Sequence, residues 1–91
     1  MKKLPPETVA LVEVENEGLV SLLGQVVTLM CMNYIYTGRL AGVNTTCVLL
    51  EEASVVFETG AYSCPTWKLA EKLPNSLYVN TSAIEAFAII K

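Results

Sequence analysis

Two apolar segments joined by a short polar turn, residues 34–43 and 47–57, constrain the fold of this chain more than any other feature. In the first segment Tyr36, Gly38 and Leu40 stand at every second position, and the side chains of a strand alternate between its two faces. These three residues therefore share one face. Asparagine and threonine, which favour turns, separate the two segments. The pattern predicts two consecutive strands joined by a tight turn.

The composition indicates more apolar surface than a small domain can bury. The 91 residues are enough for one domain with a limited core, yet 53% of them are hydrophobic and only 16% are charged. Soluble domains usually carry about 25% charged residues. Part of the apolar surface is therefore expected to be covered by further copies of the chain, the alternative being contact with lipid.

The lipid alternative depends on residues 18–38, which carry no charge and would be long enough to span a bilayer as a helix. This segment contains Gln25, Thr28 and Asn33, and its second half is rich in the β-branched and aromatic residues typical of strands. The two N-terminal lysines are followed by prolines and acids, which do not form the apolar core of a signal peptide. We therefore expect a cytoplasmic protein with no membrane partner.

The cysteines and the lack of histidine in the sequence argue against catalysis and metal binding. Cys31, Cys47 and Cys64 have no metal-ligand spacing, and an odd number of scattered cysteines is typical of reduced thiols in a cytosolic protein. A thiol enzyme would lack its usual histidine base. Glu51 and Glu52 are neighbours in a predicted strand, so they point to opposite faces and do not form a catalytic pair. We expect a non-enzymatic protein without cofactor or metal, with its cysteines packed in the core or at an interface.

The N-terminal part is expected to hold an extension and a short helix. Residues 1–16 form the extension, in which the alternation at residues 12–15 suggests an extra strand. Asn16 is placed to cap a helix over residues 17–23, with Gly24 just past its end. The buried stripe of this helix would consist of Leu19, Leu22 and Leu23.

Three further strands are predicted at residues 25–32, 77–79 and 84–90. A run at residues 67–73 also alternates, but without a clear apolar face. A short helix followed by five closely spaced strands is the pattern of a small β-barrel, which residues 17–91 would form as one domain.

Several segments of the sequence resemble the motifs of the Sm and Sm-like family, small ring-forming proteins that commonly bind RNA. Residues 36–53 resemble the first half of its bipartite motif, residues 77–84 its second half, and residues 22–29 the end of its helix and its first strand. The resemblance implies a mainly β fold, with a short N-terminal helix and a five-stranded, strongly bent antiparallel open barrel of the SH3 type. Residues 58–76 would be a variable connection within it.

The resemblance also implies a ring. In that family the last two strands of neighbouring subunits pair edge to edge, which here would give a cyclic homo-oligomer of about five to seven copies. The exposed edges of an open barrel invite such pairing. The expected interface consists of Leu77, Val79, Ile84, Phe87 and Ile89.

A candidate site for single-stranded RNA at the central pore follows from the same resemblance. It consists of Asn44, Thr45, Thr46 and Cys47 in one turn and of Asn80, Thr81 and Ser82 in another. The acid, aromatic residue and asparagine of the family's first turn are replaced here, and so is the arginine of its second. Neutral groups remain, and the net charge of −3 opposes nonspecific binding to phosphates. These residue types are also ordinary turn formers.

Two functions are compatible with these features. The first is a ring that binds single-stranded RNA weakly, or in an atypical way, at a neutral pore. The alternative is a structural or protein-interaction ring that has lost RNA binding, with a protein partner on the face bearing Trp67. Trp67 and Tyr62 either cover the barrel or form a recognition patch. Arg39, the only arginine, either pairs with a surface glutamate or contacts phosphate.

Overall fold

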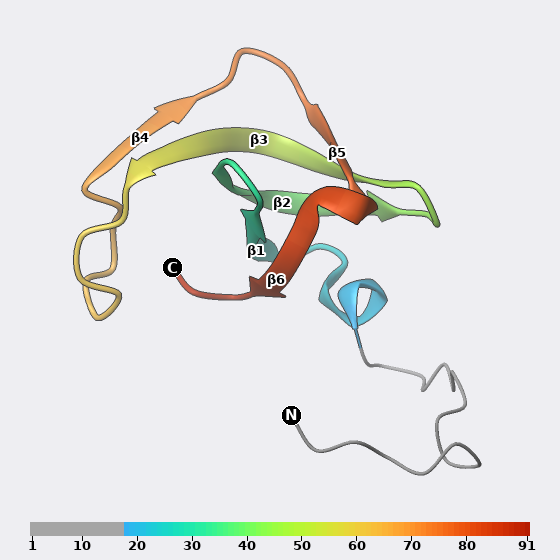
Figure 1. The fold of residues 1–91 in the computed structure, drawn as a ribbon, viewed down its shortest axis with the longest axis horizontal. Helices are drawn as coiled ribbons and strands as arrows, with labels where there is room; N and C mark the ends of the chain where they lie inside the picture. The colour runs from blue at the N-terminus through green and yellow to red at the C-terminus, as the bar shows by residue number, and fades with distance from the viewer. Residues whose placement is uncertain (1–17) are drawn as a thin grey trace, which may run out of the picture.

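Six antiparallel strands and two short 3₁₀ helices make up residues 18–91, the part of the chain that this computed structural model describes (Figure 1). Their bounds are η2 (Leu19–Leu22), β1 (Val26–Cys31), β2 (Ile35–Val43), β3 (Cys47–Glu58), β4 (Leu69–Lys72), β5 (Leu77–Asn80), η3 (Thr81–Ala83) and β6 (Ile84–Ala88). The strands form one sheet in the order β4-β3-β2-β1-β6, and β5 also pairs with β3. The sheet does not close, because β6 pairs only with β1 and β5 only with β3 within the described range. The expected mainly β architecture with an open sheet is confirmed.

The strand count differs from the expectation by one. The alternating run at residues 67–73 contains β4, which pairs with residues 54–58 of β3, while β5 pairs with residues 47–50 of the same strand. β4 and β5 thus lie end to end along β3. Pro74 stands between them and has no backbone N–H to donate, so pairing is interrupted there. The sheet therefore has six strands in place of the predicted five.

The predicted helix over residues 17–23 is mostly wrong. Only the single 3₁₀ turn η2 forms, and the residue before it, Gly18, has a φ of 72°, which no right-handed helix contains. Leu19 and Leu22 do pack against the core, but Leu23 is 45% exposed and does not belong to a buried stripe. The expected N-terminal extension of residues 1–16, its extra strand and the cap at Asn16 lie outside the described residues.

The uncharged segment at residues 18–38 is not a membrane helix. It forms η2, β1 and the first half of β2. Among residues 18–91, no helix has the length and apolar character needed to cross a membrane.

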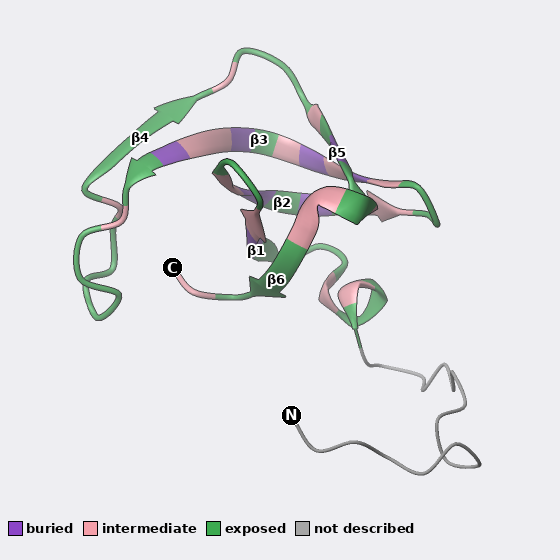
Figure 2. Ribbon diagram, in the orientation of Figure 1, coloured by how far each residue is buried: buried purple, intermediate pink, exposed green. Residues whose placement is uncertain are grey.

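The core lies on one face of the curved sheet and is built from alternate residues of four strands. Figure 2 shows buried positions in β3 and β2, whereas β4 and the far end of β6 are exposed. The cluster consists of Val27 and Leu29 from β1, Leu40 from β2, Val48, Leu50 and Ala53 from β3, and Val79 from β5. Each buried leucine or valine stabilises the fold by about 1.5–3 kcal/mol.

β3 bends where it passes Gly38 of β2. At this point the register of the two strands shifts, and Glu52 has a φ of 51°, the left-handed conformation that marks a bulge. Leu50 and Ala53 both face the core although they are three residues apart, because the bulge resets the alternation. The bend allows one end of the strand to pair with β5 and the other with β4.

Gly38 permits this bend because it has no side chain. A Cβ atom at this position would lie 3.0 Å from the carbonyl oxygen of Glu51 and 3.1 Å from the Cα of Ala53. Both are backbone atoms, which cannot rotate away. A Cβ at Gly42 of the same strand would meet only the Leu49 side chain, at an ordinary 3.6 Å. The two glycines of β2 therefore have different roles.

We predict that Gly38→Ala lowers the free energy of unfolding by about 1–3 kcal/mol, because the new methyl group overpacks against the backbone of β3. For a domain of this size each 1 kcal/mol corresponds to roughly 4–8 °C in Tm. Gly42→Ala is the matched control and should be neutral or slightly stabilising. Thermal unfolding followed by circular dichroism compares the two, and equal Tm values for both variants would contradict the steric account of the bend.

Candidate functional site

The two turns proposed as a binding site lie against each other within one protomer. The backbone N–H of Thr81 donates to the carbonyl oxygen of Thr46 at 2.9 Å, and the Thr81 hydroxyl donates to the carbonyl oxygen of Thr45 at 2.9 Å. The adjoining residues Cys47 and Asn80 are direct partners in the β3–β5 ladder. All seven predicted positions are thus gathered at one end of the sheet, where β2 turns into β3 and β5 turns into β6.

The first turn is held by Asn44. Its side-chain oxygen accepts hydrogen bonds from the backbone N–H of Thr46 at 2.8 Å, from the Thr46 hydroxyl at 3.0 Å and from the backbone N–H of Cys47 at 2.8 Å. This arrangement is an Asx turn, the conventional role of asparagine between two strands. The oxygen of Asn44 is therefore already occupied, and only its amide N–H groups remain to meet a ligand.

More side-chain hydrogen-bonding groups are unoccupied in the second turn than in the first. Asn80 and Ser82 are exposed, and neither side chain makes a hydrogen bond within the part of the chain that the structure describes. Each can donate and accept. The paired turns therefore present a fixed backbone with uncharged, unoccupied hydrogen-bonding groups, mainly from the second turn.

A shallow cleft of about 240 Å³ adjoins the second turn. It lies between the β1–β2 turn and β5. Aromatic and amide side chains line it together with apolar residues; the aromatic and amide residues are Tyr34, Tyr36, Tyr78, Asn33 and Asn80. The rings of Tyr34 and Tyr36 are 6.1 Å apart and tilted by 48°. Of the seven predicted RNA-binding positions, only Asn80 lines this cleft, and the predicted interface residues Leu77 and Val79 line it as well.

Tyr78 was not predicted as part of the site or of the interface. It is 69% exposed, whereas its neighbour Val79 is buried in the core and Leu77 packs against the core. The signal that could have identified Tyr78 is the period-two alternation of β5, which turns it outward when Leu77 and Val79 point inward.

Two titratable groups that line the cleft, Cys31 and Tyr36, have raised pKa values. Burial, followed by the nearby Glu85 carboxylate, raises the pKa of the Cys31 thiol. Burial is also the main cause that raises the pKa of the Tyr36 hydroxyl, with smaller contributions from Cys31 and Tyr34. Both groups stay protonated at neutral pH, so the cleft offers uncharged groups.

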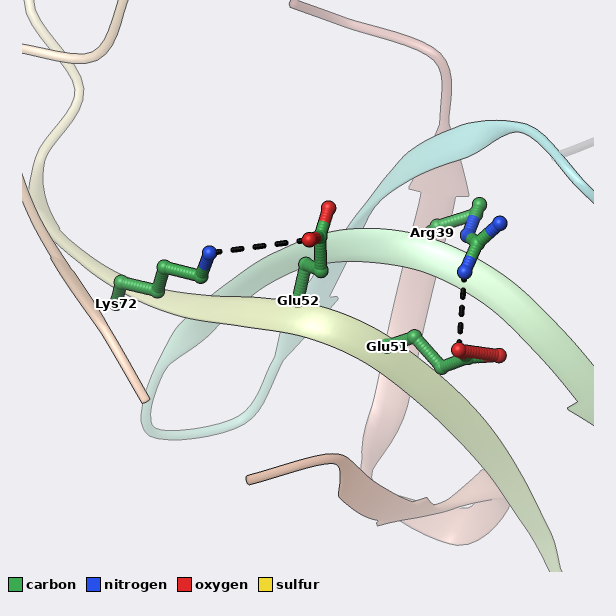
Figure 3. A network of polar contacts seen from close by, with 4 residues as sticks. All are labelled: Arg39, Glu51, Glu52 and Lys72. Atoms are coloured by element: carbon green, nitrogen blue, oxygen red, sulfur yellow. Dashed lines mark hydrogen bonds and ion pairs between the residues drawn. The ribbon is translucent and has the colours of Figure 1, made fainter. Parts of the chain in front are cut away.

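Every lysine and arginine of residues 18–91 already has a partner. Figure 3 shows Arg39 paired with Glu51 at 2.9 Å and Lys72 with Glu52 at 3.9 Å. Lys68 pairs with Glu58 at 3.2 Å, and the ammonium group of Lys91 is bound by backbone carbonyls. Of the two roles expected for Arg39, the surface ion pair is thus the one observed. Such exposed pairs are weak, about 0–1 kcal/mol, but a phosphate would have to displace them.

The expected interface residues occupy three different environments. Phe87 and Ile89 are exposed, at 39% and 57%, in and just after β6. Leu77 and Ile84 are half-buried and pack against the core, and Val79 is 5% exposed and belongs to the core itself. The Val79 side chain is therefore not available to a neighbouring subunit.

The acids and thiols form no reactive cluster within residues 18–91. Glu51 and Glu52 pair with different cations on different strands. No three His, Cys, Asp or Glu side chains of this part come close enough to hold a metal ion. Cys31 and Cys47 are half-buried free thiols, whereas Cys64 is exposed. Cys64 therefore does not pack in the core, and of the two expected environments only an interface stays a prediction for it.

Tyr62 and Trp67 do not cover the core. Their rings meet edge to face at a centroid distance of 6.5 Å, and neither is among the residues that pack on the core cluster. Both rings instead contact the ammonium group of Lys91.

A scan against models of known protein families found no match for this chain, and a search of curated proteins found no relative.

We predict that Thr81→Val lowers the free energy of unfolding by about 1 kcal/mol, because it removes the hydroxyl that links the two turns while keeping the shape of the side chain. Hydrogen exchange of the amides at residues 44–47 should become faster. Ser82→Ala is the control, since the Ser82 hydroxyl makes no such bond, and it should change neither quantity. An unchanged exchange rate in Thr81→Val would show that the turns do not depend on this contact.

Proposed function

We propose that the chain is a self-assembling subunit of a cyclic, Sm-like ring of about five to seven copies, acting as a structural or protein-interaction scaffold. The observation that carries this proposal is the pair of unpaired sheet edges on β5 and β6. η3 links the two strands, yet among residues 18–91 each has a hydrogen-bonded neighbour on one side only.

Free edges are a physical reason for assembly. A row of unpaired N–H and C=O groups pairs readily with another strand, and cyclic closure gives every edge a partner. The side chains beside these edges are apolar and exposed: Tyr78 on β5, with Phe87 and Ile89 on and after β6. Pairing of β5 with β6 of the next copy would cover all three.

The bend at Gly38 and the contact between the two turns also support an Sm-like assembly. The resemblance implies strongly bent strands and a meeting of both turns near the ring axis. The short backbone distances at Gly38 and the hydrogen bonds of Thr81 agree with these two features.

The charge distribution favours a scaffold over a nucleic-acid binder. A ring of five copies would carry 5 × −3 = −15. Nonspecific RNA binding requires lysine and arginine groups that release counterions from phosphates. The cations of residues 18–91 are held by glutamates or by backbone carbonyls.

We predict that the purified protein forms a single multi-copy particle in light scattering after size exclusion. Five copies of the 9.9 kDa chain would give 49.5 kDa, and seven would give 69.3 kDa. The double variant Tyr78→Lys, Phe87→Lys should be monomeric, because both positions are exposed in the protomer and both would bring charge to the joined edges.

Val20→Lys is the matched control for this experiment. Val20 is 63% exposed and lies in η2, which is not one of the strands with an open edge, so the particle should persist. A wild-type monomer at all concentrations would contradict the proposal, and so would a double variant that assembles like the wild type.

Single-stranded RNA is a second candidate function, favoured by the geometry of the paired turns. The free amide and hydroxyl of Asn80 and Ser82 lie beside a cleft that presents Tyr34 and Tyr78. Aromatic rings stack on unpaired bases, and amides read base edges. Such binding would depend on stacking and hydrogen bonds rather than on charge.

We predict that, if RNA binds at this site, Asn80→Ala weakens binding of a short labelled RNA about fivefold to tenfold, the value of one or two lost hydrogen bonds. The affinity should change little with salt, because the cations of residues 18–91 are already engaged by other groups of the chain. Asn75→Ala, an exposed asparagine in the β4–β5 turn, should leave binding unchanged. Fluorescence anisotropy measures the RNA affinity of the wild type and of both variants. No binding of the wild type at low salt would exclude this function.

A further inference from the structure

The side chain of Lys91 is bound by the connection between β3 and β4. Its Nζ donates hydrogen bonds to the carbonyl oxygens of Thr59 at 2.8 Å, Ala61 at 2.8 Å and Thr66 at 3.0 Å. A lysine ammonium has three N–H donors, so each one has an acceptor. The contact joins residues distant in sequence, since the chain after β6 runs back toward the β3–β4 connection (Figure 1).

Two aromatic rings complete the surroundings of this ammonium group. Nζ lies 4.6 Å from the centroid of the Trp67 ring and 5.8 Å from that of Tyr62. Both distances are within the range of about 6 Å for cation–π attraction. The rings meet at 86°, so they form two walls of a corner. Three carbonyl oxygens and two rings together make a cage for a cation.

The cage binds a cation through its shape and its dipoles, not through a negatively charged side chain. Lys91 makes no ion pair with any acid of residues 18–91, and the lysines that do, Lys68 and Lys72, are exposed surface pairs. Carbonyl oxygens and ring faces stabilise a cation without carrying a full negative charge themselves. A primary ammonium on an alkyl chain fits this surrounding, because the nitrogen meets the oxygens while the chain leaves the cage.

Hydrogen bonds within the β3–β4 connection support the shape of the cage. Gly60 lies between Thr59 and Ala61, whose carbonyl oxygens accept from Lys91. It has a φ of 66°, and a Cβ there would lie 3.2 Å from the Cβ of Lys68. The carbonyl oxygen of Ala61 also accepts from the backbone N–H of Cys64 at 3.0 Å, and the Thr59 hydroxyl donates to the carbonyl oxygen of Gly60 at 3.0 Å. These local bonds do not involve Lys91, so they can remain when its side chain is removed.

We infer that residues 59–67 form a binding site for the primary ammonium group of a lysine side chain, occupied in this protomer by its own Lys91. When Lys91 is removed, the site accepts an alkylammonium group supplied by another molecule. This inference does not rest on the ring, because every contact lies within one protomer. Tyr62 and Trp67 then act as walls of an ammonium site, a role that differs from both expectations, a cover over the barrel and a general recognition patch.

The test uses Lys91→Met, which keeps a long side chain but removes the ammonium group, with Lys72→Met as the matched control at a lysine outside the cage. Trp67 is the only tryptophan of the chain, so its fluorescence reports on the cage alone. Lys91→Met should change the emission of Trp67, and Lys72→Met should not. Circular dichroism checks that both variants keep the β fold.

The probe is n-butylammonium chloride, compared with n-butanol and with potassium chloride at equal concentrations. In Lys91→Met, n-butylammonium should change the Trp67 emission with saturation, while butanol and potassium should not. In the wild type the tethered lysine competes at an effective concentration on the order of mM, so the apparent affinity should be weaker by about twofold or more. A response no larger than that to butanol or to potassium chloride overturns the inference, as does equal affinity in the two proteins.

A measurement on the wild type does not depend on any variant. The ε-methylene protons of Lys91 should be shifted upfield by the two rings in NMR spectra, whereas those of Lys72 should keep ordinary shifts. Ordinary shifts for Lys91 would show that the cage is empty in solution and would contradict the assignment.

Discussion

The close contact between the backbone of Gly38 and the bulge of β3 determines the rest of this structure. β3 is the longest strand, and it can face β5 with one end and β4 with the other only because it bends where it passes Gly38. The same bend returns Ala53 to the core after the alternation is broken at Glu52. It also leaves β5 and β6 at the two borders of a sheet that curves without closing. The open edges that we propose as assembly surfaces are therefore a consequence of this one contact.

Most charged side chains on the surface of residues 18–91 are paired with a neighbouring group. Positive groups of residues 18–91 are engaged locally, by glutamates across neighbouring strands or by the carbonyl cage. Exposed apolar side chains remain at the edges of β5 and β6, and neutral polar groups remain at the second turn. Of the acids, Glu71 and Glu85 are exposed and make no ion pair within residues 18–91. Such a surface favours contacts between protein copies, where buried apolar area and strand pairing supply the free energy, over attraction to a polyanion.

The sequence predicted the parts of the fold that follow from local periodicity. The positions of β1, β2 and β3 follow from alternating apolar residues, and the two turns follow from Asn44 and from the polar run after Val79. It did not predict the helix correctly, because Gly18 in a left-handed conformation leaves room for a single 3₁₀ turn. Nor did it separate Tyr78 from Leu77 and Val79, because apolar character at a sheet edge does not by itself indicate on which face of the strand a side chain lies. The Lys91 contact could not be predicted, because it joins elements more than twenty residues apart and depends on the path of the β3–β4 connection.

The central claim is that the edges of β5 and β6 are completed by identical copies. Amide hydrogen exchange, followed as a function of protein concentration, tests it most directly. The account predicts that amides of β5 and β6 become protected together as concentration rises, while those of β1, β2 and the middle of β3 are protected throughout. Rapid exchange in β5 and β6 that does not change with concentration would contradict it.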